Sequence, residues 1–147
     1  MNGIVEQSKA LNFIFAGNCL FTIKSLTTDK HYTYKVIGSN TSYYRVYDIS
    51  GRLVLKVEDN KFVFDKHATF LVDYYKTHNF KESFSDNRYL LILAFCFTIE
   101  MLKLHHTHSN IEIWHHGRCG RCARPLTVPE SIQLGLGPEC AKLLSIN

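Results

Sequence analysis

Apolar and polar residues alternate along the first part of the chain in short runs that turn-forming residues separate. In residues 31–37, Tyr32, Tyr34 and Val36 share one face of an extended strand, and Lys35 lies on the other face. Similar runs occupy residues 19–23, 43–49, 52–57 and 61–64, with turn residues at 28–29, 38–40, 50–51 and 59–60. Short runs joined by such turns predict an antiparallel β meander.

The hydrophobic period becomes helical after residue 65. Ala68, Leu71, Val72 and Tyr75 predict a helix of roughly ten residues. A longer helix is predicted over residues 87–105, with Ser85 or Asp86 as its cap. Because residues 89–97 are apolar on every side, this helix should be buried on more than one face, against the sheet or a second copy of the chain. Residues 111–114 predict a last strand, so the fold class is α+β, an antiparallel β meander with two helices.

Composition and charge are those of a globular intracellular protein. Of 147 residues, 46% are hydrophobic and 20% are charged, which excludes a disordered chain. The net charge of +4 is compatible with a nucleic-acid partner, although there is no run of Lys and Arg. The longest apolar run, residues 89–97, is shorter than the roughly 20 residues of a membrane span, and no signal peptide is recognisable.

Cysteines at metal-ligand spacing mark the C-terminal part, and we divide the chain into an α+β domain, 1–110, and a zinc-binding module, 111–147. Cys119 and Cys122 form a C-x-x-C knuckle, in which Gly120 is expected to supply the positive φ of a tight turn. Cys140 would complete a treble-clef-like zinc finger. A structural zinc ion takes four ligands, and His115 or His116 lies close enough to be the fourth. Free thiols are the alternative reading.

Two short helices are predicted around the third cysteine. Thr127 and Glu130 fit a capping box for the first helix, and Gly135 fits its C-terminal end. Pro138 opens the second helix and puts Cys140 in its first turn, where the helix dipole should favour the thiolate. Cys19 and Cys96 lie in apolar runs and are expected in the core.

Residues 114–140 read W-H-x-G-R-C-G-R-C-x-R-x-L-T-x-P-x-S-I-x-x-G-x-G-P-E-C, with x standing for variable positions. This pattern resembles the C-terminal zinc-binding domain of unknown function in a family of small uncharacterised phage proteins. Residues 16–22 match the A-G-N-x-x-F-T segment near the start of such proteins, and residues 31–35 match their basic-aromatic strand. The resemblance implies a viral or mobile-element protein with a metal-binding tail and no established activity. We expect the protein in the cytoplasm of the host cell. It favours His115 as the fourth ligand, because His116 occupies a variable position.

Other polar groups offer further candidate chemistry. His105, His106, His108, His115 and His116 form a histidine-rich stretch that suits a second metal site or solvated helix-end positions equally. Tyr32, Tyr34, Tyr43, Tyr44 and Tyr47, interleaved with Lys35 and Arg45, suit either base stacking or core packing. The helix that carries Cys140 has no Asn or His for a nuclease, and no catalytic motif is present, so an enzyme is not expected.

Arginines recur at every third position around the knuckle, at Arg118, Arg121 and Arg124. They can bind phosphates while the metal fixes their backbone, or they can form a solvated basic face. The sequence favours a non-enzymatic zinc protein that binds nucleic acid or a nucleoprotein complex. The alternative is an inhibitor or adaptor that acts on a host machine, such as a defence or transcription complex, with purely structural zinc.

Overall fold

The computed structural model describes residues 1–147 except 41, 67, 71–72, 74–86, 106–107 and 145–147. Seven antiparallel strands form one sheet in the order β1-β7-β2-β3-β4-β5-β6. The strands are β1 Gly3–Ile4, β2 Asn18–Ser25, β3 His31–Asn40, β4 Tyr43–Asp48, β5 Leu53–Glu58, β6 Lys61–Val63 and β7 Ile111–His115. The predicted α+β class and meander are confirmed, since β2 to β6 pair in sequence order.

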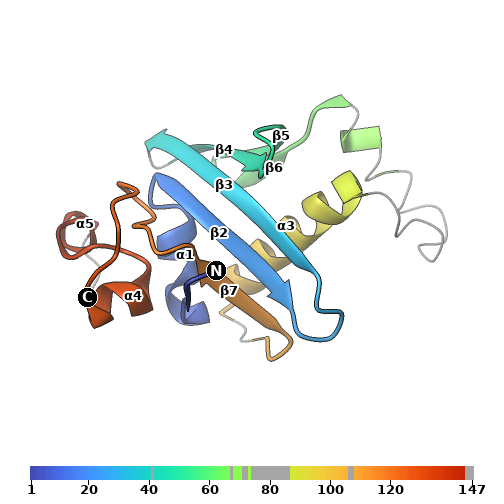
Figure 1. Cartoon of the computed structure of the whole chain (residues 1–147). Helices are drawn as coiled ribbons and strands as arrows, with labels where there is room; N and C mark the ends of the chain where they lie inside the picture. Colours follow the sequence, from blue (N-terminus) through green and yellow to red (C-terminus); the bar gives the residue numbers. More distant parts are fainter. Residues whose placement is uncertain (41, 67, 71–72, 74–86, 106–107, 145–147) are drawn as a thin grey trace.

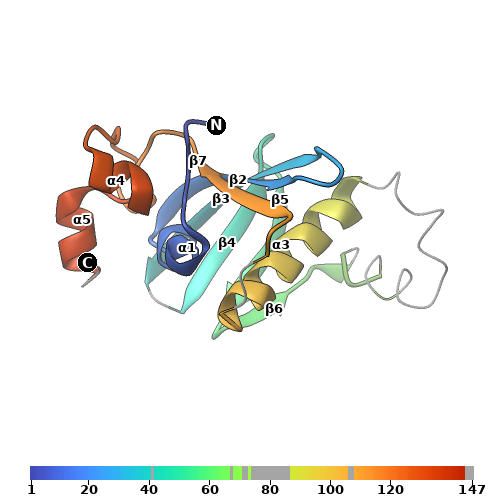
Figure 2. The ribbon, with the colours of Figure 1, turned by 90° about the horizontal axis from the view of Figure 1, so that it is seen from below.

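Two helices pack on one face of the sheet, α1 (Gln7–Ile14) and α3 (Asn87–Lys103). Figures 1 and 2 show both on the same side, with β2 and β3 turned to the viewer in Figure 1. The predicted long helix is therefore confirmed as a core helix. Of the shorter predicted helix, residues 66, 68–70 and 73 are helical, and the rest lies outside the described residues, as do the two proposed caps Ser85 and Asp86.

The core lies between these helices and the inward side chains of the sheet. Phe13 of α1, Phe95 of α3 and Phe21 and Tyr34 of the sheet are all fully buried. Tyr34 stacks on Phe21 with 5.5 Å between ring centroids, and its hydroxyl donates a 2.6 Å hydrogen bond to the carbonyl of Leu91. The alternation predicted for β3 is thus observed, with Tyr34 and Val36 buried and Lys35 exposed. Cys19 is also a core residue, whereas Cys96 is half-buried.

The structure corrects two expectations about strands. Residues 38–40 do not end β3, which continues to Asn40 with an irregular register against β4. A Cβ added at Gly38 would lie 2.3 Å from Cδ1 of Tyr44, so glycine is needed there for close packing of β4. β7 lies between β1 and β2 in the sheet, although residues 111–115 had been grouped with the zinc-binding module. The part of the module outside the sheet begins at His116.

The C-terminal module sits at one end of the sheet and contains α4 (Pro129–Leu134) and α5 (Pro138–Leu143). Its own buried cluster is small and consists of Cys119, Leu136, Cys140 and Ala141, with Ala16 from the other part of the chain. None of the helices among the described residues has the length and apolar character that a membrane span requires.

Candidate metal centre

The sulfurs of Cys119, Cys122 and Cys140 lie within 4.8 Å of one another. The knuckle and the start of α5 bring them together. Cys119 and Cys140 are buried, Cys122 is exposed, and none of the five cysteines forms a disulfide. Three sulfurs at this separation suit a soft or borderline metal ion such as zinc, which binds thiolates.

Backbone N–H groups point at the Cys119 sulfur. Arg121 N lies 3.4 Å and Gly137 N 3.3 Å from its Sγ. Burial disfavours the Cys119 thiolate, yet the hydrogen bonds from the backbone of Gly137, Cys122 and Arg121 lower its pKa below the usual value. Cys119 is thus prepared to act as a metal-bound thiolate.

The start of α5 does not lower the pKa of Cys140 in the predicted way. Burial, aided by Cys122 and Cys119, raises the pKa of Cys140 to about 11, although the Arg121 side chain opposes this effect. The physical reason is that burial disfavours the charged form and that the neighbouring sulfurs compete for negative charge. A bound cation would remove this conflict by stabilising the three thiolates together.

Glycine has a different role in the knuckle from the one predicted. Gly120 does not have positive φ; that conformation belongs to Ala123, at φ 62°, and to Gly117, at φ 76°. A Cβ added at Gly120 would lie 2.6 Å from the carbonyl oxygen of Phe13. Gly120 therefore allows the knuckle to approach α1 closely, and its carbonyl accepts a 2.8 Å hydrogen bond from the N–H of Asn18.

The two predicted helices of the module are present, with one correction. Val128 is the N-cap residue of α4, and no side chain caps it, so Thr127 and Glu130 do not form the expected capping box. The early Pro129 fixes the start of α4 instead. Gly135 ends α4 at φ 71°, and Pro138 opens α5 with Cys140 in its first turn, as predicted.

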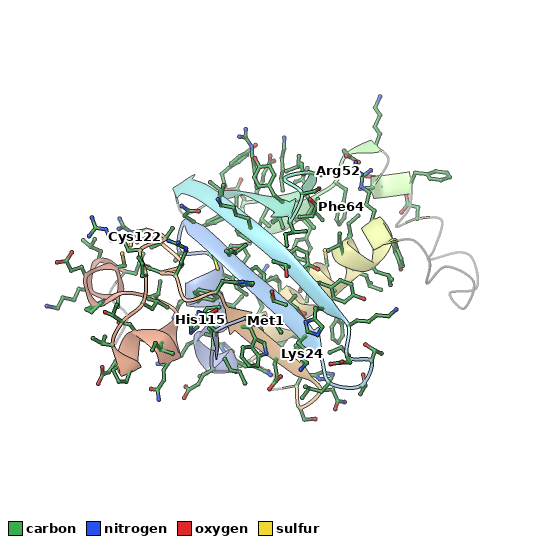
Figure 3. All side chains as sticks on the ribbon, in the orientation of Figure 1. Met1, Lys24, Arg52, Phe64, His115 and Cys122 are labelled. Carbon is green, nitrogen blue, oxygen red and sulfur yellow. The ribbon has the colours of Figure 1, made fainter. Side chains whose placement is uncertain are left out.

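His115 is not a member of the three-sulfur group and has other contacts. Its Nδ1 accepts a 2.9 Å hydrogen bond from the N–H of Gly117, its Nε2 is buried without a hydrogen-bond partner, and its ring contacts Phe13 edge to face at 6.5 Å between centroids. Burial lowers the pKa of His115, which keeps the ring neutral. The group of sulfurs does not include His115, so this arrangement does not support the predicted fourth ligand. Figure 3 shows His115 near the sheet and Cys122 farther out in the module.

Among the described residues, the remaining histidines of the histidine-rich stretch do not gather into one site. His116 forms a 2.8 Å hydrogen bond between its Nε2 and Oγ1 of Thr22. His105 is exposed at the end of α3, and Nδ1 of His108 accepts a 3.1 Å hydrogen bond from the N–H of Asn110. His106 lies outside the described residues.

The arginines around the knuckle are all exposed. Arg121 and Arg124 line a pocket beside the three cysteines, together with Glu139. Arg121 donates a 3.8 Å hydrogen bond to Sγ of Cys140, and Arg118 donates a 3.0 Å hydrogen bond to the carbonyl of Ala123. Two of the three predicted arginines therefore share a surface hollow with the candidate metal ligands.

The fold and the site define an α+β protein with a seven-stranded antiparallel sheet and a C-terminal three-cysteine cluster that can hold a metal ion. Residues 114–145 match the model of DUF6011, a family of unknown function, and this stretch contains all three cysteines. A comparison with curated proteins gave no match, and a comparison with solved structures gave none either.

Proposed function

We propose that the C-terminal module binds one zinc ion and that the protein is a non-enzymatic, phage-type factor that binds nucleic acid or a nucleoprotein complex. The observation that carries the proposal is the grouping of three sulfurs, within 4.8 Å of one another, beside Arg121 and Arg124 in one pocket. A bound metal would fix the knuckle backbone and thereby hold these arginines in place. Fixed guanidinium groups are well suited to phosphate oxygens.

Zinc suits the chemistry of this donor set. Three thiolates favour zinc over the hard ions magnesium and calcium, which take oxygen ligands. A tetrahedral ion would still need a fourth ligand. The pocket beside the sulfurs contains Glu139, whereas His115 would have to leave Gly117 and Phe13 to reach them. We therefore favour Glu139 or a water molecule over His115 as the fourth ligand.

Measurements of zinc affinity distinguish between these candidates for the fourth ligand. Competition with a chromophoric chelator should show weaker zinc binding for Glu139→Gln if the carboxylate is a ligand, and unchanged binding if the ligand is water. His115→Gln should retain the zinc stoichiometry in both cases. A strong loss of zinc from His115→Gln, with the sheet still folded, would restore His115 as the ligand.

Salt dependence tests the nucleic-acid proposal. Binding of fluorescent oligonucleotides should weaken steeply between low and moderate salt, because phosphate contacts release counterions. Arg124→Gln should reduce the slope of log K against log salt by about one. Lys30→Gln is the matched control, since Lys30 is exposed in the turn between β2 and β3, whereas the knuckle contacts the opposite end of β2 at Asn18. Salt-independent binding, or no binding with zinc fully loaded, would contradict the proposal.

A second candidate, an inhibitor or adaptor that binds a host protein, is favoured by one specific observation. Three large apolar side chains at or near α3 are exposed: Leu93 by 44%, Phe97 by 52% and Leu104 by 67%. Exposed apolar groups that lie close together are typical of protein contacts. A pull-down from host lysate with nuclease treatment separates the two functions, because only a protein partner would remain bound.

A further inference from the structure

The face of the sheet opposite α1 and α3 carries a concentration of aromatic and basic side chains on β4. Tyr43, Arg45 and Tyr47 alternate with the buried Tyr44 and Val46, so they share the outer face. Arg45 is exposed, and both tyrosines are half-buried. Of the five tyrosines predicted as one candidate stacking surface, Tyr34 and Tyr44 lie in the core and Tyr32 packs against it. Tyr43 and Tyr47 remain on the outer face.

Arg45 lies between these two tyrosines on β4. Its guanidinium carbon lies 5.8 Å from the centroid of the Tyr43 ring, and Tyr47 follows on the same face of the strand. Alternate residues of a strand are about 6.6 Å apart, so two rings and one planar cation follow one another along β4. Each of these groups can stack on a nucleic-acid base.

The charges around this row are mainly positive. In the register of the sheet, Lys35 lies opposite Tyr47, and Lys56 lies opposite Arg45. One carboxylate, that of Glu58, lies opposite Tyr43 on β4 and opposite Lys61 on β6. At the other end of the outer face, Glu112 accepts a 3.3 Å hydrogen bond from the Trp114 indole. Charge complementarity therefore points to an anionic partner over β3 to β6.

This basic-aromatic surface lies next to the knuckle. A Cβ added at Gly17 would lie 3.8 Å from the carbonyl oxygen of Arg121 and 3.6 Å from that of Gly38. Gly38 follows Ile37, which lies opposite Arg45 in the sheet. Only Gly17, Gly38 and Ile37 therefore stand between Arg121 and Arg45 in this chain of neighbours. One ligand can contact both the arginines of the module and the row on β4.

We propose that the outer face of the sheet binds single-stranded nucleic acid, with bases stacked on Tyr43 and Tyr47 and the phosphates continuing to the arginines of the knuckle. This inference rests on the proposed function and makes it more specific. An antiparallel sheet with exposed aromatic and basic residues is a known way to hold unpaired bases. A duplex keeps its bases stacked on each other, so it can use the arginines but not the two rings.

The test compares a single-stranded oligonucleotide with a duplex of the same sequence, both measured by fluorescence anisotropy on the zinc-loaded protein. The double variant Tyr43→Leu, Tyr47→Leu should weaken single-strand binding by about tenfold for each ring lost, because stacking is lost. Duplex binding should stay within twofold. The matched control, Tyr43→Phe with Tyr47→Phe, keeps both rings and should retain single-strand affinity.

The possible outcomes separate this inference from the proposed function. If the leucine variant binds single strands as the wild type does, while Arg124→Gln lowers the salt slope, the stacking surface is wrong and the arginine function stands. If the zinc-loaded wild type binds neither oligonucleotide, both proposals fail. Circular dichroism and zinc content of each variant confirm that a loss of binding is not a loss of fold.

Discussion

The sheet region and the C-terminal module are stabilised in different ways. The sheet region contains a core of large rings, including Phe13, Phe21, Tyr34 and Phe95, all fully buried. The module has two six-residue helices and a cluster of small or sulfur-containing residues around Leu136. Helices of that length are not stable alone in water. The sheet can therefore fold by apolar burial, whereas we propose that the module depends on a metal ion and on contact with its neighbour.

Phe13 is the main contact between these two regions. Its ring is fully buried, and Cβ atoms added at Gly120 or Gly135 of the module would each lie within 3 Å of Phe13 atoms. It also contacts Phe21 and His115 edge to face. One aromatic side chain of α1 is therefore both a core residue and a support for the loop that carries Cys119 and Cys122.

Removal of the metal should have the largest effect, because it should unfold the module and leave the sheet region folded. Zinc binding is expected to contribute on the order of 10 kcal/mol to folding of the module, so excess chelator or Cys119→Ser should unfold it. Hydrogen exchange should become fast in residues 117–144 and stay slow in β2 to β5. Cys96→Ser, on α3, is the control and should keep the zinc. Slow exchange in the module after metal removal would contradict the claim.

Removal of the Phe13 ring should lower the stability of both regions. Phe13→Ala should lower the free energy of unfolding by about 3–5 kcal/mol, because it leaves a cavity between α1, the sheet and the knuckle. Urea denaturation measures this loss. Phe97→Ala removes a ring that is 52% exposed and should cost much less. Equal losses from both variants would show that Phe13 is not the support described here.

A methyl group at the knuckle should push the module away from α1. Gly120→Ala would bring a Cβ to 2.6 Å from the backbone of Phe13, which should cost about 1–3 kcal/mol in stability and weaken zinc binding. Gly137→Ala is the matched control, since no atom lies within 4 Å of its added Cβ and its φ is not positive. Chemical denaturation in the presence of zinc compares the two variants, and an equally mild effect at Gly120 would argue against close packing there.

The smallest expected effect on stability comes from the loss of one hydrogen bond within the sheet region. Tyr34→Phe removes the 2.6 Å hydrogen bond to Leu91 and should lower stability by about 1 kcal/mol without changing zinc affinity. Tyr47→Phe, on the outer face, should leave stability nearly unchanged. A change in zinc affinity for Tyr34→Phe would show that the two regions are more strongly coupled than their contacts indicate.

The β meander and α3 could be predicted from the sequence because their signals are local. Alternation in residues 31–37 and the two-residue turns identify strands and their neighbours without knowledge of the tertiary structure. Short N-terminal elements were not predicted: β1 has two residues and exists through its pairing with β7, and α1 has eight residues. Such elements depend on partners distant in sequence, so local patterns do not reveal them.

At the metal centre, the spacing of the cysteines was sufficient to group them, but the surroundings were not predictable. His115 faces the core because β7 pairs with both β1 and β2, a register that the C-terminal motif does not contain. The role of Gly120 depends on Phe13, which lies more than a hundred positions earlier in the chain. Ligand spacing is local information, whereas the orientation of a nearby histidine is set by tertiary structure.

X-ray absorption at the zinc edge of the reduced, purified protein would identify the metal and its ligand atoms. We expect one zinc ion per chain, with three sulfur neighbours at about 2.3 Å and one lighter neighbour at about 2.0–2.2 Å. Absence of bound metal, or a zinc ion with fewer than three sulfur neighbours, would contradict the assignment of Cys119, Cys122 and Cys140 as its ligands.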